Sequence, residues 1–338
     1  MTPPKLVCTL WLLIALAFAG AQETYTNPVV TPVAADPDVI RAEDGSFYLY
    51  ATQDNWADGS ADHYVPIFSS LDLVNWTFVD DAFSAPPAWK ESGGFYWAPD
   101  ISYHDGTYYL YYAYSLWGDP NPCIGLATAA APEGPWEELG RAVFCSEDIG
   151  VENSIDPFVW YEDGARTMIW GSFNGIYAVE LSGDGTEAVG ETTLLADTRF
   201  EAPYVVERDG HYHLFLAAGS CCDGEWSTYT TYAGRSEDLL GPYLDSQGRD
   251  LREGGGDLIL EANEVWVGPG HSAVVTDAAG TDWFIYHAIP REDPTLENGV
   301  NRRPALLDRL EWAGGWPRVA GPTHTAQDAP RIDRSSSD

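Results

Sequence analysis

Short stretches of alternating apolar and polar residues, separated by tight-turn residues, run along most of the chain. The first clear example begins with Asp36-Pro37-Asp38-Val39-Ile40, passes through Asp44-Gly45 and continues as Phe47-Tyr48-Leu49-Tyr50. Asp-Gly between two alternating apolar runs is a strong β-hairpin signal. The pattern therefore predicts a strand, a tight turn and a second strand.

This segment, a phrase of strand, turn and strand, recurs four more times along the chain. The copies are Ala98-Pro99-Asp100-Ile101 with Asp105-Gly106, Asp156-Pro157-Phe158-Val159 with Asp163-Gly164, Ala202-Pro203-Tyr204-Val205 with Asp209-Gly210, and a looser copy from Gly270-His271-Ser272 through Ala279-Gly280. Further apolar runs, such as Ile124–Ala127 and Ala233–Ser236, bring each unit to about four strands. Repeated short strands without helical periodicity predict an all-β fold, a five-bladed β-propeller. A β-sandwich with coincidental hairpins is the alternative, and five copies of one phrase argue against it.

The two ends of the chain differ from this repeat. Lys5 precedes an apolar run from Leu10 to Ala19, and Ala19-Gly20-Ala21 offers a cleavage site before Gln22, the pattern of a secretory signal peptide. The apolar run is short for a membrane anchor. We expect residues 1–21 to be a signal peptide, 22–322 the propeller domain, and 323–338 a flexible tail. The mature protein is then secreted, either extracellular or periplasmic, and free of the membrane.

Charge narrows the range of partners. The chain has 17 Lys and Arg against 52 Asp and Glu, a formal net charge of −35. A polyanion would be repelled, which excludes nucleic acid and disfavours a substrate such as pectate. A neutral polysaccharide or oligosaccharide is compatible, and the 14 Trp and 19 Tyr supply flat faces for sugar rings. We expect the mature chain to act on such a substrate as a monomer.

Four cysteines follow the predicted signal peptide, namely Cys123, Cys145, Cys221 and Cys222. Export permits disulfides, and the spacing of Cys123 and Cys145 suits a bridged hairpin. A bond between the adjacent Cys221 and Cys222 would be strained, so two free thiols stand as an equal alternative. The sequence lacks a Cys-x-x-Cys spacing, which argues against a zinc site.

The innermost strand of each propeller blade lines the central channel, so equivalent positions of the repeat converge there. The residues at the start of the five phrases are Asp36, Trp97, Asp156, Glu201 and His271. Taken singly, an Asp-Pro is usually a turn or a cap. Three acids around one channel, however, match the needs of glycoside hydrolysis. A protonated carboxyl donates to the leaving oxygen, an ionised carboxylate activates water, and a third acid raises the pKa of the donor.

The segments around these residues resemble glycoside hydrolase family 43. They are Ala35-Asp36-Pro37-Asp38-Val39-Ile40, Trp97-Ala98-Pro99-Asp100, Ile155-Asp156-Pro157 and Phe200-Glu201-Ala202-Pro203. The resemblance covers roughly residues 25 to 320. It implies a five-bladed propeller that inverts the anomeric centre and needs no organic cofactor. It also implies that Asp36 is the general base, Glu201 the general acid, and Asp156 the residue that orients the acid and modulates its pKa.

Other segments are similar to the arabinanase branch of that family. They include Trp170-Gly171-Ser172-Phe173, Ser220-Cys221-Cys222 with Ser227-Thr228-Tyr229, Gly268-Pro269-Gly270-His271 and Asn301-Arg302-Arg303-Pro304. The resemblance implies cleavage of α-1,5-linked L-arabinofuranose chains. It also implies a channel ion, usually calcium, that His271 helps to hold, largely through water; a buried structural histidine is the alternative. Many arabinanases have a histidine where this chain has Ala35, a departure that concerns subsites and not the acids.

Four residues are predicted to bind substrate. Trp97 would stack on the sugar near the scissile bond, with a core tryptophan as an equal alternative. Asn153 and Phe173 stand beside the Asp156 strand and would line the site, and Ser172 belongs to the segment that resembles arabinanases.

Three alternatives to an arabinanase are compatible with part of this pattern. A β-xylosidase or α-L-arabinofuranosidase of the same family would differ in the loops around the channel. A retaining hydrolase of the fructan-cleaving kind also begins with an Asp-Pro element, but it uses a Glu-Cys acid motif that this sequence lacks. A non-catalytic sugar-binding propeller would not need all three acids at channel positions. The sequence does not distinguish endo from exo cleavage.

Overall fold

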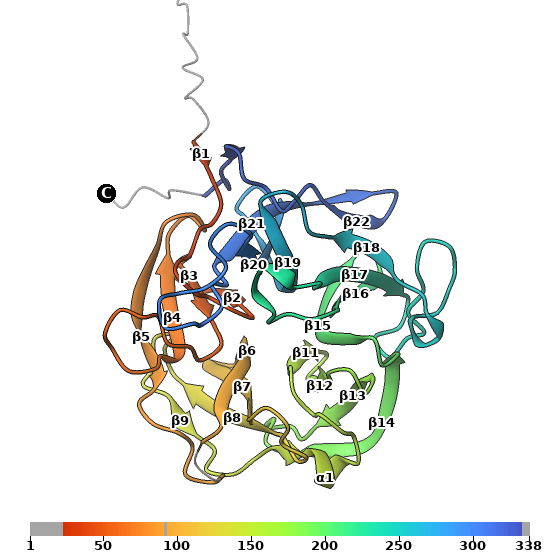
Figure 1. Cartoon of the computed structure of the whole chain (residues 1–338). Coiled ribbons are helices and arrows are strands. Elements are labelled where there is room, and N and C mark those ends of the chain that lie inside the picture. Colours follow the sequence, from red (N-terminus) through yellow and green to blue (C-terminus); the bar gives the residue numbers. More distant parts are fainter. Residues whose placement is uncertain (1–22, 91–92, 333–338) are drawn as a thin grey trace, which may run out of the picture.

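The computed structural model describes residues 23–90 and 93–332, which form a ring of β-sheets (Figure 1). Five antiparallel sheets surround a central channel in the order of the chain, so the predicted five-bladed β-propeller is confirmed. No helix within the described residues is long and apolar enough to cross a membrane.

Each blade runs from an innermost strand at the channel to an outermost strand at the rim of the ring. The first contains β2 (Asp38–Arg41), β3 (Phe47–Tyr50), β4 (Tyr64–Ser70) and β5 (Trp76–Phe83); the second contains β6 (Phe95–His104), β7 (Thr107–Ser115) and β8 (Cys123–Ala129), which is followed by β9 (Glu137–Glu138) and β10 (Phe144–Cys145). The third contains β11 (Phe158–Glu162), β12 (Ala165–Trp170), β13 (Ile176–Leu181) and β14 (Ala188–Ala196); the fourth contains β15 (Phe200–Arg208), β16 (His211–Ala218), β17 (Thr230–Ser236) and β18 (Asp257–Leu260). The fifth contains β19 (Trp266–Thr276), β20 (Asp282–Pro290), β21 (Ala305–Ala313) and β22 (Trp316–Val319). Short helical turns lie between strands: α1 (Ser146–Ile149), η1 (Gly224–Trp226) and η2 (Leu251–Glu253).

The predicted Asp-Gly turns join the two inner strands of three blades. Asp105-Gly106, Asp163-Gly164 and Asp209-Gly210 all have positive φ at both residues. Type I′ hairpin turns require this conformation, which glycine adopts without cost and aspartate tolerates. The repeat read from the sequence is therefore the hairpin at the centre of each blade.

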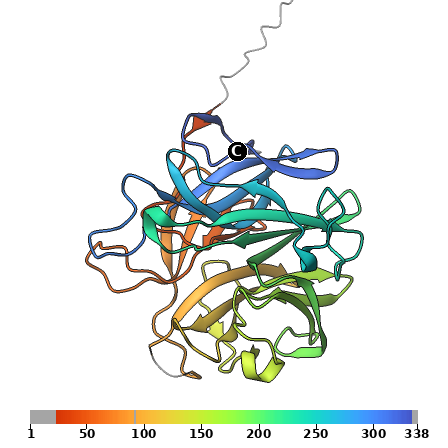
Figure 2. The same ribbon diagram turned by 45° about the vertical axis from the view of Figure 1, so that its right-hand side comes forward.

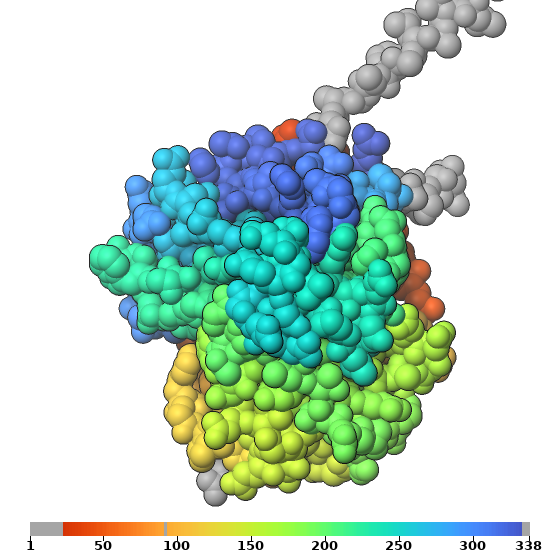
Figure 3. Space-filling model, turned by 90° about the vertical axis from the view of Figure 1, so that its right-hand side faces the viewer, coloured from red at the N-terminus to blue at the C-terminus, as the bar shows by residue number. Residues whose placement is uncertain are grey.

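Blade-on-blade packing explains the unusually apolar middle strands. β7 and β20 are buried along most of their length, whereas the outermost strands β5 and β14 are largely exposed. Each of the five interfaces between neighbouring blades holds its own cluster of buried apolar side chains. A middle strand is covered on both faces, so it lacks the clean alternation of a half-exposed strand. Figure 3 shows one edge of the ring, where the stacked blades form a continuous surface.

Both ends of the described chain close the ring at the fifth blade (Figure 2). β1 (Thr24–Tyr25) pairs with β23 (Gln327–Asp328), and Val30 forms a β-bridge with Ala305 of β21. The Tyr25 hydroxyl donates to the Leu307 carbonyl at 2.6 Å.

The C-terminal segment departs from the expectation of a flexible tail beginning at residue 323. The Thr323 hydroxyl donates to Asp308 Oδ1 at 2.5 Å, and the Arg331 amide donates to Asp277 Oδ2 at 2.9 Å. A two-residue strand such as β23 has no periodicity, so the sequence pattern did not reveal it. Residues 333–338 and the predicted signal peptide 1–21 lie outside the described residues.

All four cysteines of the described chain form disulfides. Cys123 and Cys145 are cross-strand partners on β8 and β10 and are bonded to each other. Cys221 and Cys222 form a bond between adjacent residues, which replaces the alternative of two free thiols.

Candidate active site

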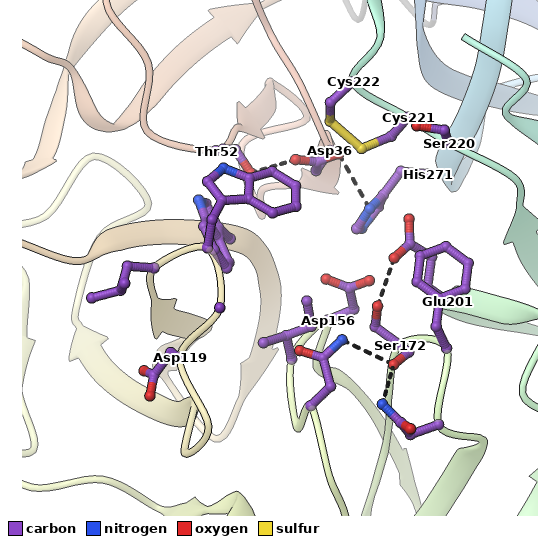
Figure 4. A pocket seen from close by; sticks show the side chains of 18 of the residues that line it. Asp36, Thr52, Asp119, Asp156, Ser172, Glu201, Ser220, Cys221, Cys222 and His271 are labelled. Carbon is purple, nitrogen blue, oxygen red and sulfur yellow. Dashed lines mark hydrogen bonds and ion pairs between the residues drawn. A yellow bond between two sulfur atoms is a disulfide. The ribbon is translucent and has the colours of Figure 1, made fainter.

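One cavity of about 850 Å³ at the central channel brings together every residue predicted for the site. The residues in question are Asp36, Trp97, Asn153, Asp156, Ser172, Phe173, Glu201 and His271. Figure 4 shows Asp36, Asp156, Glu201 and His271 turned toward the same space. Strands from all five blades or the loops beside them contribute to the lining, as expected for a site on a propeller axis.

A left-handed backbone turn recurs where each inner strand enters the channel. The residues with positive φ at this point are Asp36 (51°), Ala98 (46°), Asp156 (57°), Ala202 (55°) and His271 (49°). Such a conformation costs a residue other than glycine about 1–3 kcal/mol and is held only by its surroundings. Its recurrence in every blade indicates that the fold uses this turn to direct side chains into the channel.

The position of this turn shows that two of the predicted site residues are not equivalent to the other three, but lie one residue earlier in the repeat. Asp36, Asp156 and His271 occupy the turn itself, whereas Trp97 and Glu201 come directly before it. The pairing of β6 with β7 and of β15 with β16 is irregular at this point. The bulge in each strand brings the preceding side chain to the channel, so Trp97 and Glu201 still line the cavity.

Asp36 is surrounded by positively charged or neutral donors. The Thr52 hydroxyl donates to Asp36 Oδ2 at 2.6 Å. His271 Nδ1 lies 3.3 Å from Asp36 Oδ1, and Arg303 Nη1 lies 3.5 Å from the same oxygen. Behind the carboxylate, the Asp36 amide donates to Nδ1 of the buried His287 at 3.1 Å. This last hydrogen bond holds the strained backbone of Asp36 in place.

These neighbours keep Asp36 ionised. Burial alone would raise the pKa of Asp36, but the charges of Arg303 and His271 hold it well below its usual range. Burial lowers the pKa of His287 to about 3, so this imidazole is neutral and its Nδ1 is free to accept the Asp36 amide. Asp36 is therefore a carboxylate at any pH near neutrality.

Asp156 and Glu201 are in a different environment on the other side of the cavity. The Ser172 hydroxyl donates to Glu201 Oε2 at 2.7 Å. Asp156 Oδ2 accepts a hydrogen bond at 3.1 Å from the amide of Ala202, the residue that follows Glu201. Asp156 thereby fixes the backbone that carries Glu201.

The buried position of these two acids raises both pKa values. Burial raises the pKa of Asp156 to about 8, and the negative charges of Glu201 and Asp36 add to the shift. Burial also raises the pKa of Glu201, although the hydroxyls of Tyr229 and Ser172 stabilise its ionised form. Neighbouring carboxyls of this kind titrate as a pair. The pair consequently retains a proton at neutral pH, at which Asp36 has none.

The remaining predicted residues form the walls of the cavity. Trp97 is half-buried and its ring lies 5.5 Å from that of the exposed Trp117, so it is not a core tryptophan. Phe173 is also exposed, with positive φ, beside Asn153, whose side-chain amide donates to the Ser172 carbonyl at 2.9 Å. Apolar rings and polar acids thus face the same space, an arrangement typical of small-molecule binding sites.

His271 is also the residue predicted to help hold an ion. Its Nδ1 is engaged with Asp36. Burial alone would lower the pKa of His271, but the carboxylates of Asp36, Asp156 and Glu201 together raise it to about 9. Within residues 23–90 and 93–332, no three His, Cys, Asp or Glu side chains are grouped so that they could hold a metal. The residues present fit an ion only if water supplies most of its ligands.

Thr52, His287 and Arg303 are site residues that the sequence reasoning did not assign. Arg303 lies two residues before β21, in a segment that was named only for its resemblance to arabinanases, and Thr52 lies two residues after β3. None of the three belongs to the repeated segment at whose start the three acids stand. The β2–β3 hairpin places Thr52 beside Asp36, and the closed ring brings His287 and Arg303 there.

Comparisons with known proteins agree with this geometry. The profile of "Glycosyl hydrolases family 43" matches residues 25–317. The extracellular exo-alpha-(1->5)-L-arabinofuranosidase ArbA of Cellvibrio japonicus is 34% identical, over 91% of this chain and 90% of that protein. The extracellular endo-alpha-(1->5)-L-arabinanase 1 of Bacillus subtilis is 32% identical, over 83% and 86%.

A solved structure extends the similarity to the fold. The structure of Cellvibrio cellulosa alpha-L-arabinanase complexed with arabinohexaose has a TM-score of 0.74 and 32% identity, covering 86% of this chain and 96% of that one. The family resemblance drawn from the sequence is thereby confirmed. The chain belongs to glycoside hydrolase family 43 and is a glycoside hydrolase.

Proposed function

We propose that this enzyme hydrolyses α-1,5-linked L-arabinofuranose chains with inversion at the anomeric carbon. In this proposal Asp36 is the general base, Glu201 is the general acid, and Asp156 orients the acid and modulates its pKa. The observation that supports these roles is the contrast between the two sides of the cavity. Arg303 and His271 keep Asp36 ionised, whereas burial keeps a proton on the pair formed by Asp156 and Glu201.

The chemistry follows from this contrast. An ionised Asp36 accepts a proton from the attacking water, while the protonated acid gives its proton to the departing glycosidic oxygen. Asp156 acts through position and charge: it accepts the amide next to Glu201, and its nearness disfavours ionisation of the pair. Both requirements of acid–base catalysis are then met at one pH.

The choice of arabinan is supported by two independent points. The relatives reported above are named for arabinan cleavage, one of them endo-acting and the other exo-acting. A neutral polymer is also compatible with a chain of net charge −35, because it is not repelled. We further propose that the protein is secreted, as the names of both relatives state for those proteins.

Incubation with polysaccharides tests the substrate. We expect the protein without residues 1–21 to release arabinose-containing products from linear α-1,5-arabinan and not xylose from xylan. Product lengths followed over time distinguish the two modes, because mixed oligomers appear early in endo cleavage and a single short product in exo cleavage. Release of xylose alone would contradict the proposed substrate.

The same assay tests the acid. Glu201→Gln keeps the size of the side chain but cannot donate the proton, so kcat on arabinan should fall by at least about a hundredfold. Glu207→Gln is the matched control, since Glu207 is an exposed carboxylate on the same strand, β15. Near-normal activity of Glu201→Gln, or an equal loss in the control, would overturn the assignment.

The pH profile tests the role of Arg303. Because Arg303 and His271 hold the pKa of Asp36 well below its usual range, the acidic limb of kcat/KM should lie below the pH at which an ordinary aspartate titrates. Arg303→Gln removes that charge, so the pKa of Asp36 rises and the acidic limb should move up by about one to two pH units. A loss of activity that is equal at all pH values would contradict this account.

Arg302→Gln is the matched control for that measurement. Arg302 pairs with Asp293 in the loop at 3.0 Å and does not line the cavity. Its replacement should leave both limbs of the profile unchanged.

The proposal also includes a calcium ion beside His271, with water as most of its ligands. Metal analysis of the purified protein tests it directly. We expect about one calcium per chain before dialysis against EDTA and a lower melting temperature afterwards. A metal-free protein of unchanged activity and melting temperature would exclude a resident ion.

A further inference from the structure

The bond between Cys221 and Cys222 lies in the wall of the catalytic cavity. Both cysteines line it, and both are only partly buried. Figure 4 shows this disulfide at the same end of the cavity as Asp36 and His271 and away from Asp119. The mechanism described above gives this bond no role.

A disulfide between adjacent residues is poorly placed to stabilise the whole fold. A disulfide stabilises a fold mainly by restricting the unfolded chain, and the effect grows with the length of the loop that it closes. Cys123 and Cys145 are separated by 22 positions and tie β8 to β10, whereas Cys221 and Cys222 are separated by one. Joining neighbours restricts almost nothing beyond their own peptide unit, so the benefit must be local.

The surrounding loop holds the bond in a fixed place. The Ser220 carbonyl accepts hydrogen bonds from the Ser227 hydroxyl at 2.7 Å and the Thr228 amide at 3.1 Å. On the other side, Asn301 Nδ2 donates to the Cys222 carbonyl at 2.7 Å. Cys221 packs against the buried cluster of Ala202, Ala217 and Tyr229. The loop is thus tied to its own far end, to the core and to the fifth blade.

The bonded sulfurs differ chemically from the rest of that end of the cavity. Asp36, His271 and Arg303 present charges there, whereas a disulfide has no proton to donate and is polarisable and apolar. A furanose ring has hydroxyl groups on its edges and C–H groups on its faces. A rigid apolar surface beside a cluster of charges fits such a ring, because it contacts the C–H face without demanding a hydrogen bond.

We propose that the Cys221–Cys222 disulfide is a substrate-contacting surface that packs against the apolar face of the arabinofuranose unit bound beside Asp36. The inference rests on the proposed function and adds a specificity residue pair to it. The disulfide acts in binding: it positions the sugar and takes no part in proton transfer.

Binding of α-1,5-arabinohexaose to a Glu201→Gln protein provides the test, because the ligand is then not consumed. Replacing both Cys221 and Cys222 by Ala should raise the Kd, measured by calorimetry, by about tenfold, equivalent to about 1.4 kcal/mol. In the protein with Glu201 intact, the same pair of substitutions should raise KM on arabinan and change kcat little. An unchanged Kd would overturn the proposal.

Replacement of Cys123 and Cys145 by Ala is the matched control. That disulfide does not line the cavity, so its loss should lower the melting temperature and leave the Kd unchanged. If both pairs of substitutions weaken binding equally, the effect is one of general folding and the proposal fails. Intact mass must also show Cys221 and Cys222 oxidised in the purified protein; two free thiols would contradict the inference.

A reversible measurement covers the case in which the Cys221 and Cys222 variant does not fold. In the Glu201→Gln protein that also lacks Cys123 and Cys145, dithiothreitol reduces the remaining disulfide to two thiols and is itself oxidised to its cyclic form. The Kd should rise and should return after reoxidation; no change would overturn the proposal. Absence of arabinan hydrolysis by the unmodified protein would contradict the proposed function, whereas hydrolysis with an unchanged Kd would contradict only this inference.

Discussion

The contact between Asp36 and the positively charged side chains of the last blade is the interaction on which the site depends. Asp36 enters the channel at the start of the first blade, while His271 and Arg303 belong to the fifth. These residues meet only because the ring closes, with β1 paired to β23 and Val30 bridged to Ala305. Ring closure therefore does more than complete the core: it supplies the charges that hold the pKa of Asp36 low.

The environment of the other two acids, Asp156 and Glu201, raises their pKa values, whereas that of Asp36 lowers its pKa. Asp156 and Glu201 come from adjacent blades and share a buried region in which hydroxyl and amide groups are their hydrogen-bond donors. Burial raises both pKa values, and mutual repulsion adds to that of Asp156. The cavity thus contains an ionised carboxylate, Asp36, and a buried pair of carboxyls, Asp156 and Glu201, that retains a proton at neutral pH. The recurring left-handed turn makes this possible, because it points side chains from several blades at one space.

The sequence predicted the propeller and the lining of the cavity because both follow from a repeated local pattern. It named Trp97 and Glu201 correctly as cavity residues but treated them as equivalent to Asp36, whereas they precede the left-handed turn by one residue. A β-bulge leaves no trace in the spacing of apolar residues. It missed Thr52, which lies opposite Asp36 just beyond the paired residues of the first hairpin. It also missed Arg303, which lies outside the repeat and reaches Asp36 only through tertiary packing. It also took residues 323–332 for a tail, because strand β23 is too short to show periodicity. The bond between Cys221 and Cys222 could not be decided without the geometry of the loop.

The stereochemistry of the first product tests the central claim most directly. If Asp36 activates water on the face opposite the departing oxygen, each α-linkage must yield a β-configured product. Proton NMR of arabino-oligosaccharide hydrolysis, recorded before mutarotation equilibrates the anomers, measures this configuration. The account predicts that the β signal appears first and the α signal grows later. A first product in the α configuration would show retention and would contradict the pairing of a base at Asp36 with an acid at Glu201.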